Sequence, residues 1–319
     1  MTVVVLPGDG IGPEVMREAL RALEKVAPDL ELEEHAFGAQ AIRDTGDSLP
    51  EETLAACKAS EAVLKGPIGD PEFDAAEVRP EQGMLRLRAE LDVYANLRPS
   101  EQRHINILIV RELVGGLYFG ERGVREDGTV YDTMEYHPDQ VERIARRAFE
   151  LARGRQQRVV SVDKANVLDT SRMWRRVVTE VAADYADVEL EHMLVDNAAM
   201  QLVLNTDRFD VIVTENMFGD ILSDLAASLT GGIGLAPSAS LSDTGPGLFE
   251  PVHGSAPDIA GRGIASPAAM LLSAALMLEH GLGRADAAER LRTAVRLTQK
   301  VDRELRTAEF GDAVLRELS

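Results

Sequence analysis

Residues 3–16, VVVLPGDGIGPEVM, decide how the first part of the chain folds. The apolar run that opens this stretch is typical of a buried strand, and Pro13 is typical of the first turn of a helix. Between them stand Gly8, Gly10 and Gly12, the residue type that cradles the phosphates of a dinucleotide. That fingerprint needs its third glycine three residues after the second, where this chain has Pro13. The stretch predicts a strand, a tight turn and a helix, and it leaves phosphate binding at the turn an open question.

Alternating strand and helix patterns continue along the chain. Strand-like runs occur at residues 3–6, 30–37, 62–65, 105–110, 159–162, 188–195 and 211–213, and helical patterns at 13–26, 51–59, 138–153 and 172–186. Strands separated by helices pair in parallel through crossover connections. We therefore expect an α/β fold, and the length of 319 residues allows two domains or one large unit.

Residues 114–136 interrupt this alternation. They contain Glu126-Asp127-Gly128, a turn signal with β-forming residues on both sides. The segment therefore predicts a β-hairpin, which could act as an arm that pairs with a second subunit.

The formal net charge of −20 at pH 7 limits the partners of the chain. Such a charge repels polyphosphates, so we expect neither a nucleic acid nor an anionic membrane as a partner. Lysine occurs only at positions 25, 58, 65, 164 and 300, and an acidic, lysine-poor surface suits concentrated salt. A halophilic host and an acidic cytosolic protein are both compatible with this composition. The single cysteine, Cys57, and the lack of a signal peptide predict a cytoplasmic location.

Asp220 and Asp224 form the first candidate site. They are four residues apart on a helical pattern, so their carboxylates lie on one face, about one turn apart. Two like charges at this spacing destabilise a helix unless a cation lies between them, and divalent cations prefer oxygen ligands. The alternative is a pair of solvated acids, but the flanking apolar residues favour the metal site.

Other candidates are cationic or aromatic. Arg88, Arg98 and Arg111 lie in or beside apolar segments, where guanidinium groups can capture carboxylates, although each alone could be an ordinary ion-pair arginine. Lys164 follows a buried strand in a chain that otherwise avoids lysine, which suits a general base. The alternative for Lys164 is an ion pair with adjacent Asp163. Tyr118 is either a proton donor or a core aromatic.

Six motifs give the chain a family resemblance. LPGDGIGPEV, LDVYANLRP, VRELVGGLYFGE, VVSVDKANVL, FGDILSDLA and FEPVHGSAPDIAG occur in the order found in the isocitrate/isopropylmalate dehydrogenase family of β-decarboxylating dehydrogenases. The resemblance runs from end to end. It implies two α/β domains that are not a classical Rossmann fold. The first, residues 1–94 plus 232–319, binds the cofactor, and the second, residues 95–231, carries dimerisation, metal and catalytic residues. The resemblance also places the loop of the LPGDGIGPEV motif near the nicotinamide. It places the loop of the FEPVHGSAPDIAG motif, called the late loop below, at the adenosine.

The resemblance also implies roles for individual residues. Arg88, Arg98 and Arg111 bind the two carboxylates of the substrate. Asp220 and Asp224, with Asp196 of a second subunit, hold Mg²⁺ or Mn²⁺ against the substrate. Asp196 also contacts the substrate. Lys164 of that second subunit takes the hydroxyl proton, and Tyr118 protonates the product after carbon dioxide leaves. The implied assembly is a homodimer with shared active sites, or a tetramer.

The expected cofactor is NAD. Asp258, followed by Ile259, places a carboxylate where it accepts hydrogen bonds from the adenosine ribose and repels a 2′-phosphate. The resemblance assigns cofactor contacts to Ile11, Asn166, Glu250, His253, Gly254, Ser255, Ala256, Asp258, Ile259 and Ser266. Ser266 departs from the family, which usually has asparagine there, and this puts one adenine contact in doubt.

The expected substrate is 3-isopropylmalate, oxidised and decarboxylated to 2-oxoisocaproate in leucine biosynthesis. Glu81, Met84 and Leu85 occupy the positions that accommodate its branched alkyl group in the family, and Gln82 stands where isocitrate-using relatives have serine. Alternatives are 3-methylmalate, isocitrate, homoisocitrate or tartrate. A non-catalytic regulatory subunit is a further alternative. It is disfavoured because the chain keeps all the expected metal ligands, the lysine and the tyrosine.

Overall fold

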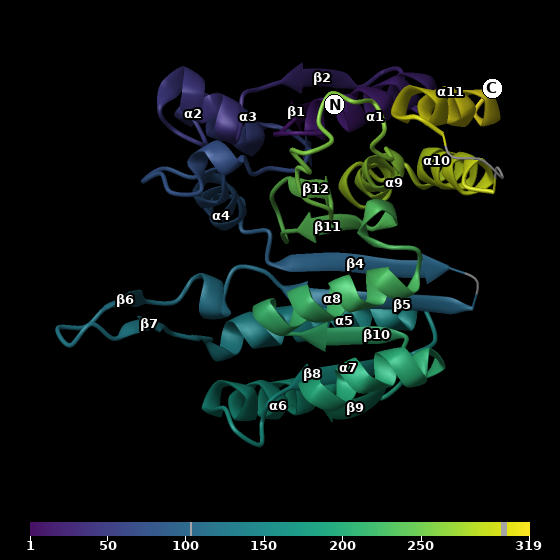
Figure 1. Cartoon of the computed structure of the whole chain (residues 1–319). Helices are drawn as coiled ribbons and strands as arrows, with labels where there is room; N and C mark the ends of the chain where they lie inside the picture. Colours follow the sequence, from purple (N-terminus) through teal and green to yellow (C-terminus); the bar gives the residue numbers. More distant parts are fainter. Residues whose placement is uncertain (103, 301–304) are drawn as a thin grey trace. The chain divides into compact units, whose positions relative to one another are not determined.

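The computed structural model describes residues 1–102, 104–300 and 305–319, and these form two compact units. Unit 1 comprises Met1–Val93 and Ile233–Ser319, and unit 2 comprises Tyr94–Gly232. The limits expected from the sequence, 94/95 and 231/232, each differ from these by one residue. Each unit is an α/β structure in which paired strands are covered by helices (Figure 1).

Unit 1 is built on a mainly parallel sheet. Its strands lie in the order β2 (Glu31–Glu34), β1 (Thr2–Leu6), β3 (Ala62–Lys65), β12 (Gly247–Pro251) and β11 (Pro237–Leu241), with β11 antiparallel to β12. Its helices are α1 (Gly12–Val26), α2 (Ala39–Thr45), α3 (Glu51–Ala59), α4 (Pro80–Glu90), α9 (Ala268–Leu276), α10 (Ala285–Thr298) and α11 (Thr307–Glu317). The alanine-rich α9 packs on β11, β12 and α1, and its small side chains permit this close burial.

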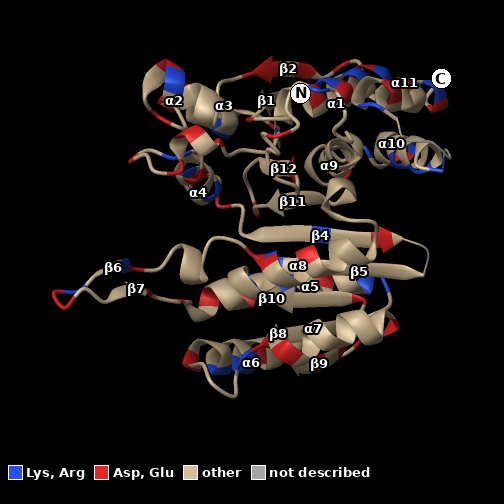
Figure 2. Cartoon of the chain, viewed as in Figure 1, with Lys and Arg blue, Asp and Glu red and all other residues tan. Residues whose placement is uncertain are grey.

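Strand β2 lies at the edge of this sheet and carries Glu31, Glu33 and Glu34 (Figure 2). Charged side chains on an edge strand oppose pairing with another chain. The strand expected at residues 30–37 is present but shorter, since β2 spans only Glu31–Glu34.

The turn after β1 is bonded to two other loops of unit 1. The N–H groups of Asp9 and Ile11 donate to the carbonyl oxygens of Pro67 (2.8 Å) and Ser255 (2.8 Å). Gly10 has a φ of +58°, and a Cβ atom at this position would lie 2.0 Å from the oxygen of Ser255. The glycine is therefore needed for a close approach of two loops. Because these N–H groups already bond to the protein, they do not form a phosphate-binding nest.

The main strands of unit 2 also pair side by side. Its strands lie in the order β4 (Ala95–Gln102), β5 (Ile105–Glu112), β10 (Val211–Thr214), β8 (Arg158–Asp163) and β9 (Glu189–Leu194); β4 is antiparallel to β5 and the other pairs are parallel. Its helices are α5 (Pro138–Arg153), α6 (Asp169–Ala182), α7 (Val195–Leu204) and α8 (Asn216–Leu229). Helices α7 and α8 bury Ala198, Leu202, Leu222 and Ala226 against Ile109 and Val162 of the sheet. This core holds α8, and with it the candidate metal ligands, in place.

The hairpin is confirmed. Strands β6 (Arg122–Val124) and β7 (Val130–Asp132) pair in antiparallel register and project from unit 2 as an arm (Figure 1). The turn closes through a hydrogen bond from the N–H of Gly128 to the oxygen of Arg125 (2.9 Å).

Several expected limits of elements in unit 2 were inexact. The strand expected at residues 188–195 ends at Leu194, and Val195 begins α7. The helix expected at residues 172–186 is α6, which begins earlier and ends at Ala182. Within the described ranges, no helix has the length and apolar character needed to cross a membrane.

Candidate functional site

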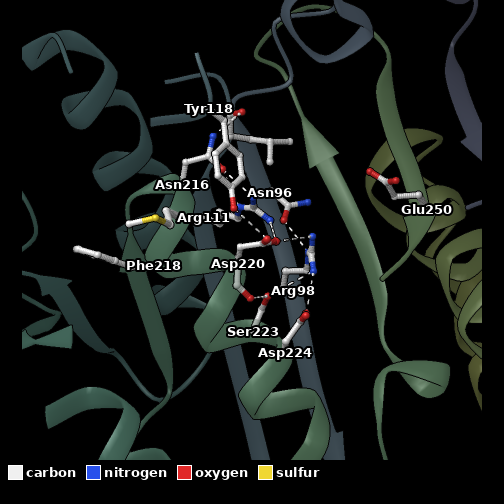
Figure 3. A network of polar contacts seen from close by, with 12 residues as sticks. Asn96, Arg98, Arg111, Tyr118, Asn216, Phe218, Asp220, Ser223, Asp224 and Glu250 are labelled. Atoms are coloured by element: carbon white, nitrogen blue, oxygen red, sulfur yellow. Dashed lines mark hydrogen bonds and ion pairs between the residues drawn. The ribbon is translucent and has the colours of Figure 1, made fainter. Parts of the chain in front are cut away.

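Helix α8 presents Asp220 and Asp224, one turn apart, as the sequence predicts (Figure 3). The helix begins where Glu215 accepts hydrogen bonds from the N–H groups of Met217 (3.1 Å) and Phe218 (2.7 Å). This cap satisfies donors that the first turn would otherwise leave unpaired. Partial burial raises the pKa of Asp224, an effect that nearby Arg98 opposes.

Two buried arginines face these carboxylates. Arg98 on β4 lies 3.8 Å from both Asp220 and Asp224, and its Nε donates to Asn96 (2.8 Å). Arg111 on β5 forms an ion pair with Asp220. Arg111 can pass over α8 because residue 219 is glycine: a Cβ atom there would lie 2.6 Å from the Cγ of Arg111. Arginine and aspartate thus neutralise each other in a site that has groups for both carboxylate and metal binding.

Tyr118 lies over the same carboxylate. Its hydroxyl donates to Oδ2 of Asp220 (3.3 Å), and the Arg111 guanidinium lies 5.7 Å from its ring centroid (Figure 3). Burial and the Asp220 charge raise the pKa of Tyr118 above its ordinary value, while Arg111 opposes the shift. Tyr118 therefore stays protonated at neutral pH, as a proton donor must.

Lys164 and Asp196 form a second cluster in unit 2. The Lys164 Nζ lies 2.5 Å from Oδ1 of Asp196, and this hydrogen bond lowers the pKa of the aspartate. The alternative pairing of Lys164 with adjacent Asp163 is wrong, because the buried Asp163 accepts two hydrogen bonds from Arg175 (2.8 and 2.9 Å). Lys164 is therefore tied to another of the expected site residues.

The carboxylates of unit 2 fit a divalent cation only in part. Asp220 and Asp224 offer the hard oxygen ligands that Mg²⁺ and Mn²⁺ prefer. Among the described residues, however, no group of three or more His, Cys, Asp or Glu side chains could hold a metal ion. Among the described residues of one chain, Asp196 is therefore not grouped with Asp220 and Asp224.

In unit 1, Arg88 belongs to a buried ion-pair cluster. Its guanidinium lies 3.1 Å from Oε1 of Glu250, and the Nζ of Lys65 lies 2.8 Å from Oε2 of the same carboxylate. Lys65 is 1% exposed, and burial lowers its pKa. Our sequence reasoning assigned no role to Lys65. The scarcity of lysine that singled out Lys164 also applies to Lys65, at the end of a predicted strand.

Most of the expected cofactor residues are close together in the sequence, in the late loop of unit 1. Ile11 is buried and bonded to Ser255, and Asp258 is exposed. The buried Nε2 of His253 has no hydrogen-bond partner among the described residues, while its Nδ1 contacts the oxygen of Gly254 (3.0 Å). A buried polar atom without a partner fits a loop that bonds to a ligand. The remaining positions are partly exposed (Ala256, Ile259) or exposed (Gly254, Ser266, and Asn166 in unit 2).

Helix α4 carries the expected substrate-selecting positions. Glu81 is exposed, Leu85 is partly exposed and Met84 is 7% exposed. Gln82 closes the start of the helix, since its Oε1 accepts from the N–H of Arg79 (3.1 Å) and its Nε2 donates to Glu77 (3.1 Å). The polar atoms of Gln82 are therefore engaged within unit 1.

A buried carboxyl near the Tyr118 segment makes stability depend on pH. Glu112 is fully buried, and burial raises its pKa from 4.5 to about 7. The protonated carboxyl therefore contributes stability that is complete below pH 4.5 and is lost as the pH rises to about 7. Between pH 5 and 7.5, wild type should lose about 2 kcal/mol of unfolding free energy relative to Glu112→Gln, as measured by urea denaturation at fixed protein concentration. An equal difference at both pH values would contradict this.

Comparison with known proteins identifies similar chains. The sequence pattern of the isocitrate/isopropylmalate dehydrogenase family matches residues 2–317. A 3-isopropylmalate dehydrogenase of Zymomonas mobilis is 50% identical, with 100% of both chains covered. Another, of Shouchella clausii, is 52% identical over 92% of this chain and 87% of its own. Among solved structures, an isocitrate dehydrogenase of Methylococcus capsulatus has a TM-score of 0.93 at 36% identity, covering 99% of both chains. A β-decarboxylating dehydrogenase of Thermococcus kodakarensis has a TM-score of 0.86 at 40% identity, covering 99% of this chain and 96% of its own.

Proposed function

The chain belongs to the isocitrate/isopropylmalate dehydrogenase family, and from this membership we propose that it oxidises and decarboxylates 3-isopropylmalate with NAD. The observation that carries the proposal is 50% identity, over the full length of both chains, to a protein named 3-isopropylmalate dehydrogenase. This activity belongs to leucine biosynthesis. The solved isocitrate dehydrogenase is less similar, at 36% identity, and so supports isocitrate only as the second candidate.

The engagement of Gln82 also favours 3-isopropylmalate. Isocitrate carries a third carboxylate, which needs a polar partner where 3-isopropylmalate presents an alkyl group. Gln82 already bonds to Arg79 and Glu77, and next to it on the helix the partly exposed Leu85 and the largely buried Met84 are apolar. Apolar side chains favour an alkyl group and leave a carboxylate without hydrogen bonds.

The reaction then follows from the residues of unit 2. Arg88, Arg98 and Arg111 bind the substrate carboxylates through charge-assisted hydrogen bonds. Lys164 of a second chain removes the proton of the 2-hydroxyl, and NAD, when bound, would accept the hydride from C2, the carbon that bears this hydroxyl. Tyr118, protonated at neutral pH, delivers a proton to C3 after carbon dioxide departs. Each residue thus moves or orients a defined group of the substrate.

The same proposal includes a divalent cation, Mg²⁺ or Mn²⁺, held by Asp220 and Asp224 with Asp196 of a second chain. When bound, such an ion polarises the C2 oxygen and stabilises the charge that decarboxylation leaves on it. In the structure Asp220 and Asp224 face Arg98 and Arg111, so the aspartates would hold the ion when these arginines bind another partner. The carboxylates of the substrate would be this partner, because they bind the arginines.

We propose further that the enzyme is a homodimer or larger oligomer with shared active sites. Helices α7 and α8 pack together and expose Met200 (51%), Leu204 (71%) and Ile221 (60%). The arm exposes a cross-strand pair, Val124 and Val130. Exposed apolar side chains gathered on one pair of helices favour an interface with another protein chain. A partial metal site within one chain supports the same conclusion.

In the same proposal, the discontinuous unit 1 holds the cofactor. The exposed carboxylate of Asp258 accepts hydrogen bonds from the adenosine ribose and repels a 2′-phosphate, so NAD is preferred over NADP. Unit 2 contributes the proposed metal ligands, the proton-transfer residues and the dimer contact. The proposed location is cytoplasmic, and the acid-rich, lysine-poor composition is compatible with either a halophilic host or an acidic cytosolic protein.

The test is the initial rate of NAD reduction by purified protein with Mg²⁺ in KCl. We expect kcat/KM for 3-isopropylmalate to exceed the values for isocitrate and homoisocitrate by about 10²-fold or more, because an apolar site leaves the third carboxylate unpaired. The value for 3-methylmalate should lie between them. A lead for isocitrate would overturn the substrate assignment, and no turnover of any of these compounds would overturn the proposed function.

A further inference from the structure

We propose that Asn216, the first residue of α8, is a positioning residue that holds Arg111 and the segment carrying Tyr118 in register with Asp220. The inference rests on the proposed function, in which Arg111 binds substrate and Tyr118 donates a proton. Asn216 itself has no role in that chemistry, and none of the roles drawn from the sequence includes it.

The side-chain amide of Asn216 is fully buried and joins two separate segments (Figure 3). Its Oδ1 accepts hydrogen bonds from Nε (3.0 Å) and Nη2 (2.7 Å) of Arg111. Its Nδ2 donates to the carbonyl oxygens of Leu113 (3.1 Å) and Gly115 (3.0 Å). Two acceptor sites and two donors are the full capacity of an amide, so every one is used.

Each of these bonds reaches a functional element. Arg111 is oriented from the side opposite its ion pair with Asp220, so the guanidinium is held at both ends. Leu113 and Gly115 precede the short helix η2 (Gly116–Tyr118), which carries Tyr118. Asp220 follows Asn216 by one helical turn on α8. One amide therefore fixes three groups of the proposed active site relative to each other.

Tyr136 reinforces the connection. Its hydroxyl accepts a hydrogen bond from the backbone N–H of Asn216 (3.0 Å) and donates to Glu215 (3.4 Å). Its ring lies against the start of η2, since a Cβ atom at Gly116, the first residue of η2, would lie 2.4 Å from the tyrosine oxygen. The start of α8 and the start of the Tyr118 segment are thus packed together, and the amide sits where they meet.

Only an asparagine satisfies this position. Aspartate retains an acceptor for Arg111 but presents a second oxygen to two carbonyl oxygens, so the two donated bonds are lost. Alanine loses the bonds on both sides. The two substitutions therefore separate the two functions assigned to the amide: Asn216→Asp removes the hold on the Tyr118 segment, and Asn216→Ala removes both.

We would measure KM and kcat of the intact enzyme for 3-isopropylmalate. For Asn216→Asp we expect kcat to fall about tenfold or more with KM within about threefold of wild type, because a displaced proton donor slows a step without weakening carboxylate binding. For Asn216→Ala we expect the same loss of kcat and, in addition, a rise in KM of about tenfold. A role confined to general stability predicts a lower melting temperature with no such split.

A double-mutant cycle tests whether Asn216 acts through Arg111. In an Arg111→Ala background, Asn216→Ala should raise KM by less than about twofold further, because the contact it removes is already gone. The control is Asn106→Ala, at the other end of β5, where an exposed asparagine also accepts a bond from an arginine, Arg155 (2.7 Å). This variant should leave both constants unchanged. Additive effects of the two substitutions on KM would overturn the proposal.

Ligand-free crystal structures make the outcome independent of the proposed function. We expect the Arg111 guanidinium to be displaced in Asn216→Ala and retained in Asn216→Asp, with the 113–118 segment moved in both. An unmoved Arg111 and an unmoved segment would overturn the inference even if 3-isopropylmalate is the substrate. If wild type turns over none of the substrates, the proposed function fails while these structures still decide the positioning role.

Discussion

Replacing Lys164 with methionine should lower kcat for 3-isopropylmalate by about 10³-fold, the range that general acid–base catalysis contributes. Lys164 is partly exposed at the end of β8 and has Asp196 as its neighbour at 2.5 Å. Methionine keeps the length of the side chain and removes its ability to take a proton. Since Lys164 is assigned to hydroxyl deprotonation and not to carboxylate binding, KM should change by less than about fivefold.

Lys164→Arg distinguishes a base from an ion pair. Arginine retains the positive charge and the bond to Asp196, but it does not lose its proton near neutral pH. We expect Lys164→Arg to be as inactive as Lys164→Met. The control is Lys58→Met, which removes an exposed lysine from an ion pair with Glu90 (2.5 Å) and should leave kcat unchanged. Substantial activity in Lys164→Arg would show that charge is what the position needs, and the assignment as base would be wrong.

The sequence predicted those parts of the fold in which one signal dominates. The apolar run at residues 62–65 and the helical pattern at 138–153 appear as β3 and α5 with the expected bounds. Strand β4 was not among the strands expected, because ANLRPSEQ has little β-branched or aromatic character; its pairing with β5 compensates. The end of β9 was misjudged because Leu194 and Val195 are both apolar, although one closes a strand and the other opens a helix.

The candidate site was accessible from sequence only where spacing carries the information. Asp220 and Asp224 could be paired because an i, i+4 relation on a helix is local. That Arg111 meets Asp220 depends on how β5 and α8 pack, which periodicity does not specify. Lys65 and Glu250 are separated by most of the chain, and only the neighbouring positions of β3 and β12 in the sheet bring them together. Buried ion pairs of this kind depend on the tertiary structure, so sequence patterns do not predict them.

Asp220→Asn should abolish activity, with a loss of about 10³-fold, because an amide oxygen is a poor ligand where several kcal/mol of charge stabilisation are needed. A more specific test mixes two inactive variants. If each active site combines Asp220 of one chain with Lys164 of the other, a heterodimer of Asp220→Asn and Lys164→Met chains has one site with both residues intact. Random reassociation of equal amounts should restore about a quarter of wild-type activity, since half the dimers are mixed and each has one working site.

The matched control pairs two substitutions assigned to the same contributing chain. Lys164 and Asp196 lie together in unit 2, so a heterodimer of Lys164→Met and Asp196→Asn chains has one defect in each of its sites. This mixture should stay inactive under the conditions that restore the first one. Recovery in the first mixture and none in the second is the pattern that shared sites require, because sites contained within one chain would leave both mixtures inactive. Equal recovery in both mixtures would place Lys164 and Asp196 in different active sites and contradict the assignment.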